Sequence, residues 1–355
     1  MTVSGPASRP FPAGDHNAFD VVVRSYVALD RNLEGRRFPH ALRRDEASEI
    51  AARLCGAARG RGFEVARIGD LDGRSRSNLA ERELYSRPYL LDDDHYAVLS
   101  PGKPLWIAVN DANHVSFRAC RPGLDLEAAW EDASAADDSM SGASGGEWAF
   151  DPDLGFIMTE AAACGSGLQA TLSLHMPALV ISGLAETALK RALEAGFIVA
   201  GAYSNTASAG GALFDLSLPS THRDPELEAM GRLAVAAKAL ADYERRAREQ
   251  LLARSPWDIL DVVGRAAGRA AGARLVSRDE AAEIVSGLRL GLACGALGGM
   301  GLESATELWS SLRVRPSTVQ RDKVSSEEEP EAAERARALR LAVTGIRFTE
   351  RYNDV

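Results

Sequence analysis

The sequence is poor in cysteine and has no long apolar run, and both absences narrow the kind of protein that it can encode. Its cysteines are scattered without a CxxC pair, at Cys55, Cys120, Cys164 and Cys294, which argues against a zinc site and a disulfide framework. No apolar stretch approaches the ~20 residues that cross a membrane. The N-terminal segment MTVSGPASRPFPAGDH lacks the apolar core of a secretory signal. We therefore expect a cytoplasmic protein with reduced thiols and no membrane segment.

An excess of positive charge is also lacking. The 355 residues include 41 Lys and Arg against 50 Asp and Glu, a net charge of -9, so overall charge gives no support to a nucleic-acid partner. A content of 46% hydrophobic and 26% charged residues is ordinary for one or two folded domains. The run Asp92-Asp93-Asp94-His95 contains metal-capable side chains, but three consecutive aspartates before a strand are more typical of a solvated turn. We expect no metal site.

The segment from Leu154 to Val180 (LGFIMTEAAACGSGLQATLSLHMPALV) is the most informative stretch. Its second half alternates between apolar and polar residues, which is the period of a strand with one polar face. Leu168, Ala170, Leu172, Leu174 and Met176 alternate with Gln169, Thr171, Ser173 and His175. Glycines at 165 and 167 supply a turn before this strand, and Pro177 closes it. The polar face either forms the floor of a site or simply meets water.

Two further segments have strand patterns. Residues 21–30 alternate, so Val21, Val23, Ser25, Val27 and Leu29 share one face, and Val22, Arg24, Tyr26, Ala28 and Asp30 the other. Residues 105–120 (LWIAVNDANHVSFRAC) are interpreted as one strand. By the same alternation its polar side would carry Asn110, Ala112, His114, Ser116 and Arg118.

The rest of the chain is mainly helical in pattern. Helices are predicted at 45–59, 79–88, 185–195 and 333–343, within 121–150, and after the start signals Asp224-Pro225 and Ser255-Pro256. Ser277 and Glu280 form a capping box before another helix. The tract 315–334 is polar and acidic and predicts a linker. We divide the chain into a flexible arm (1–18), a first domain (19–253) and a C-terminal helical domain (254–355).

The segments around residues 31 and 154–179 resemble the ATP:guanido phosphotransferases, and the bacterial protein-arginine kinases most. Framework positions that match this family are Arg31, Asn32, Leu33, Glu34, Gly35, Phe38, Pro39, Leu154, Gly155, Gly165, Gly167, Leu168, Ala170, Leu174, His175, Pro177, Ala178 and Leu179. The resemblance implies an α+β fold: an antiparallel β-sheet flanked by helices, as in the glutamine-synthetase-like catalytic domain of guanido kinases, followed by an all-α C-terminal domain.

The positions of the family's reactive residues carry different side chains here. By resemblance, the arginines that grip the nucleotide phosphates fall on Tyr26, Ala28, Ser116, Gln169 and Ala200. The catalytic glutamates fall on Ala112 and Asn205, a neighbouring glutamate on Asp111, and the reactive cysteine on Glu160. The full set of family ATP-site positions and their neighbours is Arg24, Ser25, Tyr26, Val27, Ala28, Ser116, Arg118, Gln169, Ala170, Thr171, Ala200 and Asn205. His114 is retained and is interpreted as a structural residue or as part of the site.

Two hypotheses follow from this contrast. The first is a catalytically impaired protein-arginine kinase homologue that acts as a binding or regulatory protein and does not bind Mg-ATP, the cofactor implied by the family. The alternative is an active, divergent protein-arginine kinase that uses Asp111, Glu160 and two displaced arginines, Arg24 and Arg118.

The resemblance also bears on partners. We expect a protein partner, either an activator of the family's kind or an active paralogous kinase, or a homodimer. The family's phosphoarginine-recognising Arg-Asp pair falls on Glu331 and Ala332.

Overall fold

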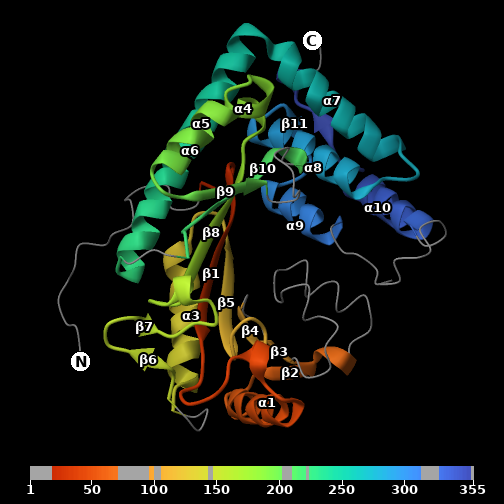
Figure 1. Cartoon of the computed structure of the whole chain (residues 1–355). Coiled ribbons are helices and arrows are strands. Elements are labelled where there is room, and N and C mark those ends of the chain that lie inside the picture. The colour runs from red at the N-terminus through yellow and green to blue at the C-terminus, as the bar shows by residue number, and fades with distance from the viewer. Residues whose placement is uncertain are drawn as a thin grey trace.

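A computed structural model describes residues 18–70, 96–99, 105–142, 147–201, 210–220, 224–312 and 328–352. Its centre is an eight-stranded sheet in which every neighbouring pair of strands is antiparallel (Figure 1). The strand order across the sheet is β2 (Glu64–Arg67), β3 (Tyr96–Leu99), β4 (Leu105–Val109), β5 (Val115–Pro122), β1 (Val22–Arg31), β8 (Leu168–His175), β10 (Leu213–Ser217) and β9 (Ile198–Gly201).

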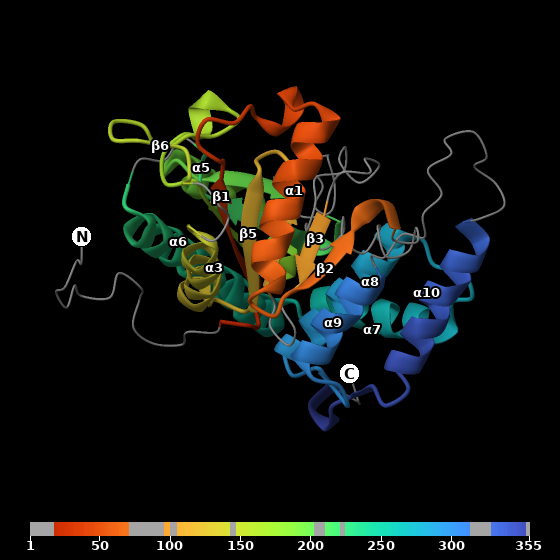
Figure 2. The same cartoon turned by 90° about the horizontal axis from the view of Figure 1, so that it is seen from below.

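Helices cover one face of this sheet (Figure 2). They are α1 (Arg44–Arg59), α3 (Leu126–Met140), α4 (Pro177–Ile181), α5 (Ala185–Glu194) and α6 (Glu226–Arg254). The apolar members of each alternating strand point toward this helical layer and form the main core, in which Val27, Phe117 and Leu172 have no exposed surface. The opposite members of the same strands form a second face, which carries mostly polar side chains.

The alternation predicted for residues 21–30 and 168–176 is confirmed by β1 and β8, but the prediction of one strand over residues 105–120 is wrong. That segment is a hairpin, in which β4 and β5 pair with Val109 opposite Val115. The chain reverses at residues 110–114, where Asn110 has a positive φ of 58°. Asparagine tolerates this conformation better than most residues, and the polar NDANH run is typical of a turn. Asn110, Ala112 and His114 therefore lie in a turn and not on the face of a strand.

The remaining helices lie beyond the end of the sheet at which β8 finishes (Figure 1). They are α7 (Pro256–Gly272), α8 (Arg278–Ala293), α9 (Leu302–Leu312) and α10 (Glu328–Ala342), with the short strands β11 (Leu297–Gly298) and β12 (Arg347–Phe348). Ser277 caps α8 as predicted, because its Oγ accepts a hydrogen bond from the Glu280 N–H at 3.2 Å, which is one of the two bonds of a capping box. The predicted fold class, an antiparallel sheet flanked by helices and followed by a helical unit, is confirmed.

Two details of the C-terminal region differ from the prediction. Helix α10 begins at Glu328, so residues 328–334 are helical and not part of the acidic linker. Glutamate and alanine favour helices, and Glu331 pairs with Arg335 one turn later at 3.7 Å. Strands β11 and β12 also interrupt the purely helical pattern. The segments 79–88 and 92–95 lie outside the described residues.

Minor elements complete the described chain. They are β6 (Phe150–Asp151), β7 (Gly155–Phe156) and the 3-10 turns η1 (Pro39–Ala41), η2 (Ile68–Asp70), η4 (Ala161–Ala163), η5 (Gly210–Ala212) and η6 (Glu350–Tyr352). Among the helices that the structure describes, none is both long and apolar enough to cross a bilayer.

A buried charge network ties α4, α6 and the segment before β1 together. The Glu244 carboxylate accepts hydrogen bonds from the backbone N–H groups of Ala178 at 3.1 Å and Leu179 at 2.9 Å. It also pairs with Arg248 at 2.8 Å, and Arg248 reaches Asp20 at 2.9 Å. Short helix α4 leaves its first N–H groups unpaired within the helix, so Glu244 satisfies them from the neighbouring helix.

His175 connects the sheet to the C-terminal helices. Its Nε2 lies 2.9 Å from Ser286 Oγ on α8, and its ring meets Trp309 of α9 edge-on at 5.3 Å. The side chain is fully buried, and burial lowers the pKa of His175 well below 6.5, helped by the positive charges of Arg289 and Arg248. The folded protein therefore keeps this imidazole neutral where the unfolded chain would protonate it.

This difference predicts a loss of stability at acid pH. Above the unfolded pKa of about 6.5 the imidazole is neutral in both states, and below it only the unfolded chain gains the proton. Between pH 7 and pH 5 His175 should therefore remove about 2 kcal/mol of the free energy of unfolding. Urea denaturation measures this difference: between pH 7 and pH 5 the free energy of unfolding of His175→Gln should fall by about 2 kcal/mol less than that of the wild type.

The exposed His40 offers a matched control. His40→Gln should follow the wild-type pH profile. An identical loss in His175→Gln and in the wild type would contradict the prediction.

Candidate functional site

The second face of the sheet gathers the polar side chains of four neighbouring strands. Cross-strand partners project to the same side, so the register assigns this face directly. Ala28 of β1 stands opposite Gln169 of β8 and Arg118 of β5, and Asp215 of β10 stands opposite Ser173. We call this set the polar face: Arg24, Tyr26, Ala28, Asp30, Ser116, Arg118, Gln169, Thr171, Ser173, Asp215 and Ser217.

The five positions at which the resemblance places phosphate-binding arginines all belong to this side of the sheet. Tyr26, Ala28, Ser116 and Gln169 are on the polar face, and Ala200 of the edge strand β9 stands opposite Asp215. The structure thus brings together residues that are far apart in the sequence. In place of cations they present a phenol, a hydroxyl, an amide and two methyl groups.

Three predicted site residues lie on the other side of the sheet. Ser25, Val27 and Ala170 are buried toward the helical layer. The Ser25 hydroxyl donates to the Gly123 carbonyl at 2.7 Å and accepts from the Asp125 N–H at 2.8 Å. These side chains hold the β5–α3 connection and the core, and they do not reach the polar face. Thr171 does reach it and hydrogen-bonds Ser217 at 2.8 Å.

Arg118 occupies the middle of the polar face and is held by its own neighbours. Its Nη2 is 2.7 Å from Asp111 Oδ2, and its Nε donates to Ser116 Oγ at 2.9 Å. Only 8% of Arg118 and 0% of Asp111 is exposed. Burial alone would lower the pKa of Arg118, but Tyr26, Asp111 and Asp30 together outweigh it and raise that pKa. The guanidinium therefore stays charged and paired.

The second displaced arginine is engaged as well. Arg24 Nε donates to Ser173 Oγ at 2.9 Å, and the Ser173 hydroxyl in turn donates to Asp215. This chain of contacts couples the guanidinium to a carboxylate through one hydroxyl. Arg24 thus lies on the polar face, as predicted, and its Nε is already hydrogen-bonded within the sheet.

Asp30 lies on this face, as the alternation of the strand predicts, although it was not among the candidate site residues. Its Oδ2 accepts hydrogen bonds from Gln169 Nε2 at 2.6 Å and Asn113 Nδ2 at 3.3 Å. Burial raises the pKa of Asp30, against the lowering effect of Arg118 and its hydrogen bonds. The alternation through Arg24, Tyr26 and Ala28 gives the side of the sheet on which Asp30 lies, but only the hydrogen bonds to Gln169 and Asn113 show that it belongs to the site.

The family-matching residues Arg31 and Asn32 build the scaffold beneath the site. Arg31 pairs with Asp137 of α3 at 2.7 Å and donates to the Ser166 carbonyl in the glycine turn at 2.9 Å. Asn32 donates to Asn113 Oδ1 at 2.8 Å and so fixes the turn between β4 and β5. These contacts position both loops that border the polar face.

His114 is part of the same scaffold. Its Nδ1 accepts the Leu33 N–H at 3.0 Å and its Nε2 lies 2.8 Å from the Arg37 carbonyl, so Nε2 carries the proton. Burial lowers the pKa of His114 to about 4. Both nitrogens are therefore occupied by backbone groups, which favours the structural interpretation of this residue.

Ala112 and Glu160 lie close to one another at the edge of the site. The Thr159 hydroxyl donates to the Ala112 carbonyl at 2.6 Å, which joins the β4–β5 turn to the segment that carries Glu160. Both Ala112 and Glu160 are exposed. Asn205 lies outside the described residues. Within the part of the chain that the structure describes, no group of three or more His, Cys, Asp or Glu could hold a metal ion.

The resulting charge balance is unfavourable for a polyanion. Among the described residues of the polar face and its bordering turn, the two arginines, Arg24 and Arg118, accompany three carboxylates, Asp30, Asp111 and Asp215. The arrangement can donate and accept hydrogen bonds, but its cations are directed at internal acceptors. The described residues therefore do not fit a magnesium-bound triphosphate.

Comparisons with known proteins agree with this architecture. The sequence model for the ATP:guanido phosphotransferase C-terminal catalytic domain matches residues 47–247, and that for the protein-arginine kinase McsB C-terminal domain matches residues 256–351. The chain is 31% identical over 310 residues to the protein-arginine kinase of Moorella thermoacetica, covering 85% of this chain and 87% of that protein. It is 30% identical over 313 residues to that of Symbiobacterium thermophilum, with the same coverage of 85% and 87%.

Solved structures show a similar fold at low sequence identity. A lombricine kinase superposes with a TM-score of 0.57 at 16% identity, over 68% of this chain and 73% of that chain. The duplicated taurocyamine kinase from Schistosoma mansoni gives a TM-score of 0.54 at 17% identity, over 68% of this chain and 33% of that chain. At these identities the likeness supports the fold alone.

The buried pair at the centre of the polar face makes a testable contribution to stability. Arg118→Met should lower the free energy of unfolding by about 3–5 kcal/mol, because Asp111 would remain buried without its ion pair. The variant Arg118→Met combined with Asp111→Asn should recover part of that loss, since the buried charge is then removed. Urea denaturation measures both.

Arg265 provides a matched control, because it pairs with Asp261 on the exposed surface of α7. Arg265→Met should leave the unfolding midpoint close to that of the wild type. Equal effects of Arg118→Met and Arg265→Met would contradict the assigned role of the buried pair.

Proposed function

The chain belongs to the ATP:guanido phosphotransferase family, and from that premise we propose that it is a protein-arginine kinase homologue with an impaired catalytic site. It acts as a binding or regulatory protein. The observation that carries the proposal is the polar face itself, where the five family arginine positions converge on one side of the sheet and none of the five is cationic.

The energetic consequence for nucleotide binding is large. Phosphoryl transfer depends mainly on positioning a highly charged triphosphate and neutralising it. A charged hydrogen bond contributes roughly 1.5–3 kcal/mol, so five together contribute on the order of 8–15 kcal/mol before non-additivity. Half of that sum already reaches the ~4 kcal/mol that separates millimolar from micromolar affinity. We therefore expect no functional Mg-ATP binding.

The loss of catalytic carboxylates supports the same conclusion. By the resemblance, Ala112 occupies the sequence position of the family's general base, and losing a general base costs about 10²–10⁴ in rate. Asp111 is the nearest carboxylate in sequence, but its Oδ2 is bonded to Arg118. Arg24 and Arg118 likewise have acceptors of their own.

The partners proposed for such a protein follow from the family resemblance. We propose a cytoplasmic protein that binds another protein, either an activator of the family's kind or an active paralogous kinase, or that forms a homodimer. A role in protein quality control belongs to the same proposal and rests on the family resemblance alone. The overall net charge of -9 gives no reason to expect nucleic acid.

Incubation with ATP and an arginine-rich protein tests the proposal. We expect no phosphoarginine, an acid-labile product that phosphorus NMR distinguishes from phosphoserine, because neither the triphosphate nor the guanidinium is oriented. The Moorella thermoacetica protein-arginine kinase, assayed in parallel, serves as the reference.

A substitution of the exposed Glu160 distinguishes kinase activity of this chain from that of a contaminating kinase. Phosphoarginine that forms with the wild type and disappears with Glu160→Gln would establish a divergent active kinase and overturn the proposal. If phosphoarginine forms equally with Glu160→Gln, the assay is repeated with Arg118→Lys. Arg118 is another residue on which the hypothesis of a divergent active kinase depends.

A further inference from the structure

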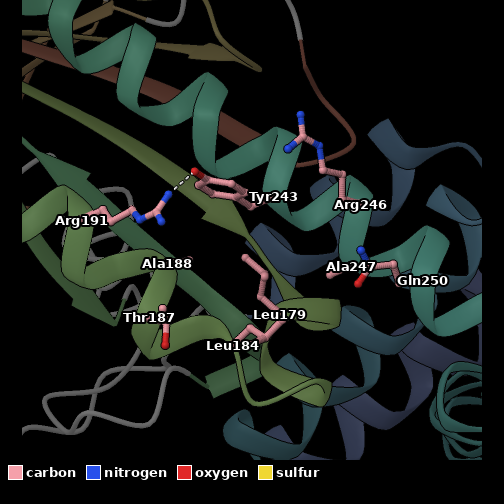
Figure 3. A pocket seen from close by; sticks show the side chains of 9 residues that line it. All are labelled: Leu179, Leu184, Thr187, Ala188, Arg191, Tyr243, Arg246, Ala247 and Gln250. Atoms are coloured by element: carbon pink, nitrogen blue, oxygen red, sulfur yellow. Dashed lines mark hydrogen bonds between the residues drawn. The ribbon is translucent and has the colours of Figure 1, made fainter.

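A cavity of about 220 Å³ opens between α4, α5 and α6, away from the polar face (Figure 3). These helices belong to the layer that covers the apolar face of the sheet. Its walls are mainly apolar and are formed by Leu179 and Leu184, the methyl groups of Ala188 and Ala247, and the ring of Tyr243. Nothing in the chemistry of guanidine phosphorylation uses this site, because the sheet separates it from the polar face.

The size of the cavity limits what can occupy it. Sites for drug-sized ligands and cofactors span about 300–1,000 Å³, so this one is too small for a nucleotide. It suits one large apolar side chain or an equally small apolar group. Burial against an apolar wall contributes affinity for such a group, but it does not by itself make binding selective for one partner.

The rim of the cavity supplies the selectivity. Arg191 of α5 donates to the Tyr243 hydroxyl, and its guanidinium lies 5.5 Å from the centre of that ring. Arg246 of α6 stands on the other side of Tyr243 in Figure 3 and is exposed. The lining residues include these two arginines and no carboxylate, although the chain as a whole has a net charge of -9. The rim is therefore a local positive site on an acidic protein.

Apolar surface continues around the cavity mouth. Leu184, which lines it, is 47% exposed, and Val180, next in the chain to Leu179, is 46% exposed. A cluster of exposed apolar side chains beside a cavity marks an interaction surface more often than isolated ones do. Thr187 and Gln250 add hydrogen-bonding groups to the lining. An apolar centre with a polar, charged rim is the usual anatomy of a protein interface.

We propose that this cavity is a docking site for an acidic segment of a partner protein. The segment inserts one apolar side chain between α5 and α6 and places flanking carboxylates against Arg191 and Arg246. Arginine suits this role because its planar guanidinium binds carboxylates in a bidentate manner. The site is independent of the proposed loss of catalysis, since an active kinase could carry it equally well.

A peptide array tests the proposal on the full-length chain. Short synthetic peptides carry a single Leu, Ile, Met or Phe among Asp and Glu residues, with matched peptides in which Ser replaces the apolar residue or Lys replaces the acids. We expect selective binding of acidic peptides with an apolar residue, and fluorescence anisotropy then measures the dissociation constant. Absence of any binding above that of the Ser and Lys peptides would overturn the proposal.

Two sets of variants locate the binding site. Arg191→Glu with Arg246→Glu should weaken the peptide by at least about tenfold, and Thr187→Trp should weaken it by filling the cavity from its rim. The control is Lys190→Glu with Arg254→Glu, which changes the net charge equally on the same two helices outside the lining. It should change affinity by less than about twofold.

Circular dichroism confirms that each variant is folded before binding is measured. Binding that survives both Thr187→Trp and the arginine reversals would overturn the proposal. Octanoate, which joins an apolar chain to a carboxylate, tests whether the cavity instead binds a small molecule with the same two groups. Saturable binding of octanoate with no bound peptide would assign the cavity to a small amphipathic carboxylate, and would also overturn it.

Discussion

The ion pair between Arg118 and Asp111 determines the chemical character of the polar face. Both groups are almost completely removed from water, and a buried charge is tolerated only while its partner remains in place. Arg118 therefore cannot turn toward a ligand without leaving a carboxylate stranded in the interior. Asp30, which lies close enough to influence the same guanidinium, adds to this constraint. A strand that could have presented a cation to a ligand instead presents an arginine that is bonded to groups of the protein itself.

The scaffold around this surface obeys separate constraints, which explains why it matches the family while the reactive positions do not. Gly167 has a φ of 68°, and a Cβ at this position would lie 2.6 Å from the Asp30 carbonyl oxygen. Arg31 holds the same turn through the Ser166 carbonyl, and His114 holds the opposite loop through two backbone groups. These residues serve the fold whether or not phosphate is transferred. The proposed loss of catalysis would remove the requirement for arginines and glutamates but would leave the requirement for the turn.

The faces of β1 and β8 could be predicted from the sequence because strand alternation is a local property. It placed Tyr26 with Ala28 on one face of β1 and Gln169 on the polar face of β8, and the register shows that these two faces lie on the same side of the sheet. The hairpin at residues 105–120 was missed because alternation continues on both sides of a turn that contains no glycine or proline. Asp30 was placed on the correct face but was not named as a site residue, because its significance comes from its neighbours on β5 and β8. The cavity depends on how three helices pack, and no local pattern encodes that.

The central claim is that the polar face does not bind the triphosphate of a nucleotide. Isothermal titration of Mg-ATP into the full-length chain tests it most directly, with the Moorella thermoacetica protein-arginine kinase titrated under the same conditions as the reference. The account predicts no saturable heat up to about a millimolar nucleotide. A dissociation constant of about a micromolar would contradict it.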